Sequence, residues 1–109
     1  MNKKITETII NHIGEHGICA RYGGEEIIIY LNNVEDRNKT SDFLNELRKK
    51  IEKTVIGLNN RYKTVTVSIG ASLNKTDKID VKNAIKIADE LLYDAKNSGK
   101  NKLILQEVC

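Results

Sequence analysis

The stretch CARYGGEEIIIYL, Cys19 to Leu31, contains the turn and the apolar strand around which the rest of the chain can be arranged. Two glycines between two strand-like segments are typical of a tight β-hairpin. The apolar run from Ile27 to Leu31 does not alternate with polar residues, which predicts a strand covered on both faces. Glu25 and Glu26 stand at the start of this strand, directly before the apolar run. They indicate either a site for a hard cation such as Mg²⁺ or a solvated hairpin whose charges serve solubility.

A short helix is expected on the N-terminal side of the hairpin. Ile5, Ile9 and Ile13 recur every four residues and form one apolar helical face. Gly14 is the expected end of this helix, because glycine accepts the left-handed conformation found past helix ends. The segment GICARY, residues 17–22, then predicts the first arm of the hairpin.

A second helix and a further strand are expected after the hairpin. Asn32 to Lys39 is polar and indicates a loop, and Thr40 or Ser41 is the expected helix cap, with Asp42 in the first turn. The segment from Lys63 to Ser72 is rich in β-branched residues and predicts a strand. The apolar stripe of the helix is predicted to comprise Phe43, Leu44, Leu47, Ile51 and Val55, with Gly57 and Asn59-Asn60 ending the helix.

A third helix and a last strand complete the pattern. A loop is expected from Asn74 to Lys78, a helix cap at Asp80, a helix end at Gly99 and a short strand from Lys102 to Leu105. The resulting order, α-β-β-α-β-α-β, favours an α+β fold with helices packed on one mainly antiparallel sheet. The buried helical face is predicted to comprise Val81, Ala84, Ile85, Ala88, Leu91, Leu92 and Ala95.

Composition limits the class of protein. A chain of 109 residues suits one small domain, and its net charge of +3 is too small to indicate nucleic-acid binding by itself. No segment is long and apolar enough to span a membrane, so a soluble cytoplasmic protein is expected. Cys19 and Cys109 are far apart in the sequence, which favours free thiols over a disulfide or a metal site.

Three segments together resemble one known family. RYGGEEI, Arg21 to Ile27, resembles the GGDEF signature of diguanylate cyclases in its GGEEF form. TVTVSIGAS, Thr64 to Ser72, resembles the strand that follows the next helix in that family. ADELLYDAKNSGKNKL, Ala88 to Leu103, resembles the closing pattern A-D-x-A-L-Y-x-A-K-x-x-G-R-N. Residues 1–109 are therefore identified as a single, N-terminally truncated GGDEF domain, which implies a ferredoxin-like fold of the nucleotidyl-cyclase type.

The resemblance implies an activity and a set of site residues. Family members condense two GTP molecules into cyclic di-GMP and release pyrophosphate, with one GTP on each of two facing domains. Glu25 matches the carboxylate that binds the catalytic Mg²⁺ or Mn²⁺ and helps to activate the attacking 3′-hydroxyl, and Glu26 matches the second acidic position. Gly23 and Gly24 match the glycines against which the nucleotide lies.

Two lysines match the part of the family site that holds phosphate. Lys96 matches the lysine that meets the triphosphate. Lys100 stands where the family usually has arginine, so it keeps the charge but loses the planar, two-pronged grip on phosphate. The alternative role of both residues is that of ordinary basic side chains at a helix end, where cations are favoured.

One family segment has no counterpart in these residues. The pattern D-x-D-x-F-K-x-x-N-D belongs to the first central strand, which supplies a metal-binding aspartate, and to the guanine-recognising helix after it. Its absence implies weak binding of metal-nucleotide and no measurable synthesis of cyclic di-GMP by this chain alone, and the chain can equally be a fragment. It also implies two apolar strands with unpaired edges, which can close up on each other or recruit a second chain. We therefore expect a homodimer or a complex with a sensory-domain partner.

Three functions are compatible with these residues to different degrees. The first is a diguanylate cyclase domain with a remnant metal-nucleotide site, and the second is a degenerate module that signals through partner binding or self-association. The third, an RNA-binding α+β domain, is disfavoured because RNA-recognition sheets display aromatic side chains flanked by basic ones, whereas this strand offers carboxylates and only Tyr30. The product-inhibition motif R-x-x-D of the family would fall on residues 14–17, where Gly14 replaces the arginine and Gly17 the aspartate, so cyclic di-GMP is not expected to bind there. His16 is expected to be an ordinary surface residue.

Overall fold

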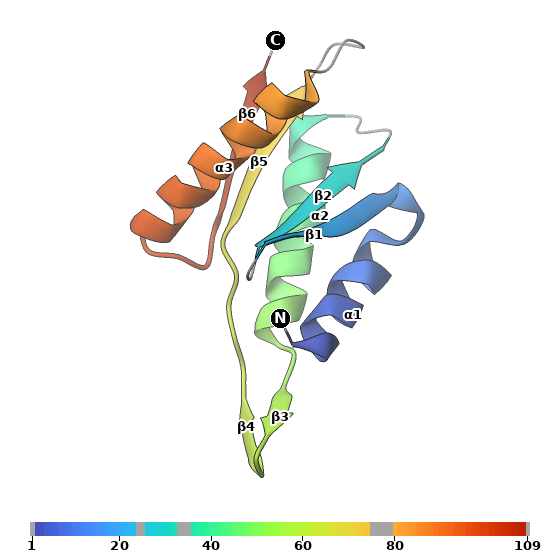
Figure 1. The fold of residues 1–109 in the computed structure, drawn as a ribbon, viewed down its shortest axis with the longest axis vertical. Coiled ribbons are helices and arrows are strands. Elements are labelled where there is room, and N and C mark those ends of the chain that lie inside the picture. Colours follow the sequence, from blue (N-terminus) through green and yellow to red (C-terminus); the bar gives the residue numbers. More distant parts are fainter. Residues whose placement is uncertain (1, 24–25, 33–35, 75–79, 109) are drawn as a thin grey trace.

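The computed structural model describes residues 2–23, 26–32, 36–74 and 80–108 (Figure 1). The α+β class is confirmed, and the predicted order of elements is present with one additional hairpin. The elements are α1 (Lys3–Ile13), the 3₁₀ helix η1 (Gly14–His16), β1 (Gly17–Gly23), β2 (Glu26–Leu31), α2 (Arg37–Glu52), β3 (Ile56–Leu58), β4 (Arg61–Lys63), β5 (Ile69–Asn74), α3 (Val81–Asn97) and β6 (Leu103–Val108).

The strands form three separate two-stranded sheets rather than one continuous sheet among the described residues. β1 and β2 are antiparallel, with Gly17 opposite Leu31 and a register irregularity between Arg21 and Gly23. β3 and β4 are also antiparallel, whereas β5 and β6 are parallel. β2 and β5 therefore each have a hydrogen-bonded neighbour on one side only within the described part of the chain.

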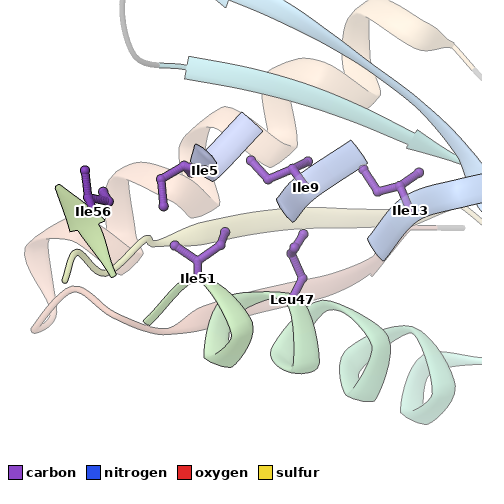
Figure 2. Close-up of a cluster of buried hydrophobic side chains, with 6 residues drawn as sticks. All are labelled: Ile5, Ile9, Ile13, Leu47, Ile51 and Ile56. Carbon is purple, nitrogen blue, oxygen red and sulfur yellow. The ribbon is translucent and has the colours of Figure 1, made fainter. Parts of the chain in front are cut away.

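The main hydrophobic core lies between α1, α2 and β3. Figure 2 shows Ile5, Ile9 and Ile13 of α1 pointing toward Leu47 and Ile51 of α2, with Ile56 beside them. The isoleucines recur every four residues, so one side of α1 is continuously apolar and can be buried. Both predicted helical faces are confirmed at these positions.

Only one face of β2 is covered by this core. Ile27, Ile29 and Leu31 pack against it. Tyr30 points to the other side and is 50% exposed. The prediction that both faces of this strand are fully covered is therefore wrong, because the described elements put α1 and α2 on one side of the hairpin only.

The predicted end of α1 and the predicted start and end of α3 are confirmed. Gly14 caps α1 with φ 50°. Asp80 caps α3, and its carboxylate accepts a hydrogen bond from the Asn83 N–H at 3.2 Å. Gly99 follows α3 with φ 120°, and the Lys100 N–H donates to the Ala95 carbonyl at 3.0 Å, which is the long bond of a Schellman motif.

The predicted start of α2 is wrong by one turn. The helix begins at Arg37, and the cap is Asp36, whose carboxylate accepts from the Lys39 N–H at 2.8 Å. Thr40 lies inside the helix, where its side chain is buried and its hydroxyl donates to the Asp36 carbonyl. The expected loop is therefore shorter than Asn32–Lys39, and residues 33–35 lie outside the described residues.

The predicted end of α2 is also wrong. The helix stops at Glu52, so Val55 lies beyond it and is 45% exposed. Asn59 and Asn60 adopt φ values of 52° and 64°, the left-handed pair that a tight hairpin requires, and they join β3 to β4. The predicted strand from Lys63 to Ser72 is replaced by the end of β4, a segment without a ladder, and β5.

The last predicted boundaries shift by a few residues. Asn74 belongs to β5, and residues 75–78 of the predicted loop lie outside the described residues. β6 runs to Val108, beyond the predicted end at Leu105. Val81, expected on the buried face of α3, is 57% exposed because it stands at the first turn. Within the part of the chain that is described, no helix has the length and apolar character needed to cross a membrane.

Candidate functional site

The hairpin turn carries the first group of predicted site residues. β1 ends at Gly23, which pairs with Glu26 at the start of β2. Glu26 is half-buried. Gly24 and Glu25, the predicted nucleotide-contacting glycine and metal-binding carboxylate, lie outside the described residues. Their roles stay predictions, while Gly23 and Glu26 mark where the turn is located.

The end of α3 carries the second group. Lys96 is exposed in the last turn of this helix. Lys100 is also exposed, and its backbone has φ 59°, a conformation that is uncommon for a residue with a Cβ. The Schellman bond to Ala95 holds that backbone in place, so Lys100 projects from a defined bend rather than from a helix.

The strands that follow the two groups in the sequence start toward the same end of the fold. In Figure 1, β2, β5 and β6 all begin at the same end of the strands. The hairpin turn precedes β2, and the connection that carries Lys100 precedes β6. The folding of the chain therefore brings the starts of β2 and β6, more than seventy residues apart in the sequence, to the same end of the strands (Figure 1).

A side-chain network behind Lys100 was not anticipated from the sequence. Arg48 donates to the Asn101 side-chain oxygen at 2.8 Å, and the Asn101 amide donates to Glu52 at 2.6 Å. Asn101 has φ 46°, a left-handed conformation that asparagine tolerates better than most residues. An asparagine two residues after a helix-ending glycine was the available signal. The network joins the end of α3 to α2 and thereby positions the bend at Lys100.

A cleft of about 770 Å³ separates the β1–β2 hairpin from the β5–β6 sheet. All residues of β2 and all residues of β5 line it, together with side chains from α2 and α3. Its described charged lining consists of the carboxylates Glu26, Asp36 and Asp89, with no lysine, arginine or histidine. The strands predicted to have unpaired edges have thus not closed up on each other.

The described residues set limits on a metal site. No group of three or more His, Cys, Asp or Glu side chains gathers in the described ranges. Glu26 supplies one hard oxygen donor at the turn. Mg²⁺ is usually held by only one or two carboxylates while waters and substrate phosphates complete its shell. The single carboxylate of Glu26 therefore fits an ion that is bound mainly by a nucleotide. It does not fit an ion enclosed by protein ligands alone.

The segment aligned with the product-inhibition motif has a structural role. Gly14–His16 forms η1, and the ring of His16 lies edge-on to Phe43 with ring centroids 5.3 Å apart. The second histidine, His12, bonds through Nε2 to the Phe43 carbonyl oxygen at 2.8 Å. Both histidines are therefore engaged with one residue of α2.

The fold is that of diguanylate cyclase domains. It resembles diguanylate cyclase SiaD from Pseudomonas aeruginosa, solved in complex with its activator SiaC, with a TM-score of 0.84 and 23% identity over 94% of this chain and 39% of that chain. It also resembles the active GGEEF domain of a diguanylate cyclase from Vibrio cholerae, with a TM-score of 0.78 and 24% identity over 96% of this chain and 65% of that chain. The predicted fold is confirmed by these two similarities.

Sequence comparison identifies the family. The family model "Diguanylate cyclase, GGDEF domain" matches residues 3–102. The chain therefore belongs to the GGDEF domain family, as the three sequence segments predicted. Similar proteins include the probable diguanylate cyclase DgcT of Escherichia coli, 30% identical over 96% of this chain, and diguanylate cyclase A of Treponema denticola, 35% identical over 82% of this chain. The chain spans about a quarter of the length of these curated relatives, 24% in each case.

Proposed function

We propose that residues 1–109 are a single, partial GGDEF domain that binds metal-GTP at the hairpin turn but does not make cyclic di-GMP on its own. In this proposal Glu25 holds the Mg²⁺ or Mn²⁺ that accompanies the triphosphate, and Glu26 supplies the second acidic group. The observation that supports the proposal is that β2, which follows the GGEE segment in the sequence, and β6, which follows the bend at Lys100, begin at the same end of the strands in a GGDEF domain (Figure 1). Its use of GTP suggests a cytoplasmic location.

The glycines, lysines and glutamates of the proposed site have different roles in binding. Gly23 and Gly24 have no side chains and let the nucleotide approach the turn closely. Lys96 and Lys100 provide positive charge for the phosphates, each as a point charge rather than a planar fork. A divalent ion, when bound, offsets the repulsion between the phosphates and the glutamates. The chain itself therefore orients the triphosphate between an acidic turn and a basic helix end.

Recognition of the guanine base is the weak part of this site. A site discriminates a base through polar groups that pair with its edge, and loss of those groups costs both affinity and selectivity. The pattern D-x-D-x-F-K-x-x-N-D, which carries such groups in the family, is not present in these residues. We therefore expect ATP to compete with GTP at similar concentrations, and we expect no turnover.

Calorimetry with a non-hydrolysable GTP analogue and Mg²⁺ tests the binding. Glu25→Ala should weaken binding at least about tenfold and Lys96→Ala about fivefold, because each removes a charged partner of the metal-triphosphate. Glu46→Ala and Lys86→Ala are matched controls, since both residues are exposed on helix surfaces and neither belongs to the predicted site. Equal effects of the site and control variants would contradict the proposal.

Incubation with GTP and Mg²⁺ or Mn²⁺, followed by chromatography, tests the lack of turnover. We expect GTP to be recovered unchanged at protein concentrations that saturate binding. Formation of cyclic di-GMP that disappears in Glu25→Ala would show that the catalytic groups are complete in this chain. That result would overturn the proposed inactivity while leaving metal-GTP binding intact.

A second candidate function, a module that acts through protein contacts, is favoured by the cleft between β2 and β5. Strand edges that lack a neighbour invite pairing with another polypeptide. Self-association or a sensory-domain partner would each meet this need. Sedimentation over a wide range of protein concentration distinguishes the two, because only self-association changes the apparent mass of the pure chain.

A further inference from the structure

Exposed basic side chains gather at one end of the molecule, where the first turn of α1, the C-terminal end of α2 and the β3–β4 hairpin meet. Ile5, Ile51 and Ile56 of these segments share one core (Figure 2). The Lys4 ammonium also donates to the Val55 carbonyl at 2.8 Å. We call this part of the molecule the basic end, and its exposed basic residues are Lys3, Lys4, Lys49, Lys50, Lys53, Arg61 and Lys63.

Few carboxylates accompany these charges in the same segments. Glu52 is half-buried and accepts a hydrogen bond from Asn101 at 2.6 Å, so it is engaged in the network that joins α2 to α3. Glu7, in the second turn of α1, is exposed. The whole chain has a net charge of only +3, so its positive charge is concentrated at the basic end and offset elsewhere. A patch of this kind attracts anionic partners.

Helix stability accounts for only part of this patch. The helix dipole favours Lys49 and Lys50 in the last turn of α2. It disfavours Lys3 in the first turn of α1, which holds no acidic residue. Arg61 and Lys63 belong to β4, and a strand has no comparable dipole to favour them. The charges at Lys3, Arg61 and Lys63 are therefore better explained by a role in binding than by a role in stability.

The β3–β4 hairpin projects from the fold at the basic end. Figure 1 shows it at one extremity of the longest axis of the molecule. All residues of β4 are exposed, and Tyr62, at 80%, is the most exposed large hydrophobic side chain among the described residues. Tyr62 is the cross-strand partner of Gly57, and a Cβ placed on Gly57 would lie 3.4 Å from the Tyr62 ring. The ring therefore leans over β3 on one side, and the rest of it is open.

The shape and chemistry of the basic end fit a lipid surface better than another macromolecule. A tyrosine ring has an apolar body and a polar hydroxyl, which suits the headgroup region of a bilayer. Anionic headgroups attract lysine and arginine side chains near the surface. Single-stranded nucleic acid stacks successive bases on several aromatic rings, whereas the described residues of these segments offer Tyr62 alone. A projecting hairpin also needs no matching groove on a soft, planar partner.

We propose that the basic end docks on a bilayer that contains anionic lipids. The Tyr62 ring lies at the headgroup level, and Lys3, Arg61 and Lys63 contact lipid phosphates or carboxylates. The long stems of the basic side chains adjust their charged groups to the headgroups, and Tyr62 adds apolar contact. None of these residues belongs to the proposed nucleotide site. Docking and nucleotide binding are therefore separate properties, and either can fail without the other.

Co-sedimentation of the chain with lipid vesicles tests the docking. The vesicles contain about three parts phosphatidylcholine to one part phosphatidylserine, or phosphatidylcholine alone. We expect saturable binding to the anionic vesicles only. Binding should fall steeply as potassium chloride is raised, because salt screens exposed charges. This arm uses the unchanged chain, so misfolding of a variant cannot confound it.

A tryptophan at position 62 reports whether the hairpin enters the headgroup region. The chain contains no tryptophan, so Tyr62→Trp has a single indole and keeps an aromatic ring on the hairpin. Its emission should shift to shorter wavelength on anionic vesicles, and brominated phosphatidylcholine in those vesicles should quench it. Tyr93→Trp is the matched control, since Tyr93 is 68% exposed but lies on α3. The emission of the control should not change.

Removal of single charges tests the role of the basic end. Arg61→Gln and Lys63→Gln should each weaken binding to the anionic vesicles about fivefold, because each basic side chain near such a surface contributes comparably. Lys86→Gln removes an exposed charge from α3 and should change binding by less than about twofold. Far-UV circular dichroism of the three variants checks that each is folded.

Three results would overturn the proposal. The first is a lack of saturable binding to the anionic vesicles, or equal binding to the uncharged ones. The second is equal affinity for polyglutamate or duplex DNA without a shift in the Tyr62→Trp emission on vesicles, which would make the partner a protein or a nucleic acid. The third is an equal loss of binding in Lys86→Gln and Arg61→Gln, which would mean that the net charge of the chain determines binding.

Discussion

The two sides of the cleft are held together in different ways. On the N-terminal side, α1, α2 and β3 bury six aliphatic side chains against one another, among them Ile9, Leu47 and Ile51. On the C-terminal side, formed by β5, α3 and β6, the buried apolar residues are Leu73, Leu91 and Ala95. The N-terminal side is stabilised by interlocking side chains, while the C-terminal side depends on close backbone approach.

Gly70 makes that approach possible. A Cβ placed on Gly70 would collide with backbone atoms of Ala88, Leu91 and Leu92 in α3. The helix can lie on β5 only because this position has no side chain. Side-chain cores absorb small changes by adjusting rotamers, but backbone atoms of a helix have little freedom to move aside. The C-terminal side should therefore be the more fragile to a single added methyl group.

The largest expected effect comes from Gly70→Ala. We expect the free energy of unfolding to fall by about 3 kcal/mol, at the upper end of overpacking effects, because the clash is with backbone. Urea denaturation followed by far-UV circular dichroism measures this change. Hydrogen exchange should show that α3 and β6 lose protection before α1 does.

Gly57→Ala is the control for that substitution. A Cβ at Gly57 would lie 3.4 Å from the nearest atom, a ring carbon of Tyr62, and Gly57 has no left-handed φ. The cost should stay below about 1 kcal/mol, as for a surface substitution in a strand. Similar losses at Gly57 and Gly70 would mean that α3 does not pack on β5 as closely as described.

The next effect concerns the joint between the two sides. Asn101→Ala removes the bonds to Arg48 and Glu52. It also places alanine, which tolerates the left-handed conformation less well than asparagine, at φ 46°. We expect a loss of about 2 kcal/mol, since hydrogen bonds to charged groups contribute about 1.5–3 kcal/mol and these are only half-buried. Denaturation curves of the variant and the wild-type chain give the difference.

Two companion variants separate the backbone from the side chain at this joint. Asn101→Gly also loses the bonds but accepts the left-handed backbone, so it should be less harmful than Asn101→Ala by roughly 1 kcal/mol. Asn97→Ala removes only an exposed bond to the Tyr93 carbonyl and should cost less than about 0.5 kcal/mol. If Asn97→Ala were as harmful as Asn101→Ala, the network would not be what joins α2 to α3.

The sequence predicted those features that depend on local spacing. Three such features are confirmed: the isoleucines of α1, the cap at Asp80 and the glycine after α3. Each of them lies in, or directly beside, the helix that it defines. The hairpin followed from two adjacent glycines. The location of the predicted site follows from that hairpin and from the end of α3, although Glu25 itself lies outside the described residues.

Features that depend on distant partners were missed. Asn101 finds Arg48 and Glu52 about fifty residues away in the sequence, a pairing that no local pattern reveals. The pair Asn59-Asn60 is a different case, because the hairpin that its two left-handed residues build is local, and the sequence pattern fits a helix stop equally well. The unpaired strand edges beside the cleft were expected from the family resemblance and not from a local pattern, because the cleft exists only through the arrangement of two sheets.

The start of α2 gives the smallest effect and sharpens this contrast between local and distant causes. Asp36 and Thr40 are both acceptable caps by residue type. The structure uses Asp36 and buries Thr40, leaving Asp42 exposed on the helix surface. Asp36→Ala should therefore cost about 1 kcal/mol, which lowers the melting temperature by roughly 5 °C in a domain of this size. Asp42, which the sequence pattern places in the first turn, lies well inside the helix. Asp42→Ala should therefore change the free energy of unfolding by less than about 0.5 kcal/mol. A larger effect at Asp42 than at Asp36 would restore the later helix start, and with it a longer loop between β2 and α2 at the edge of the cleft.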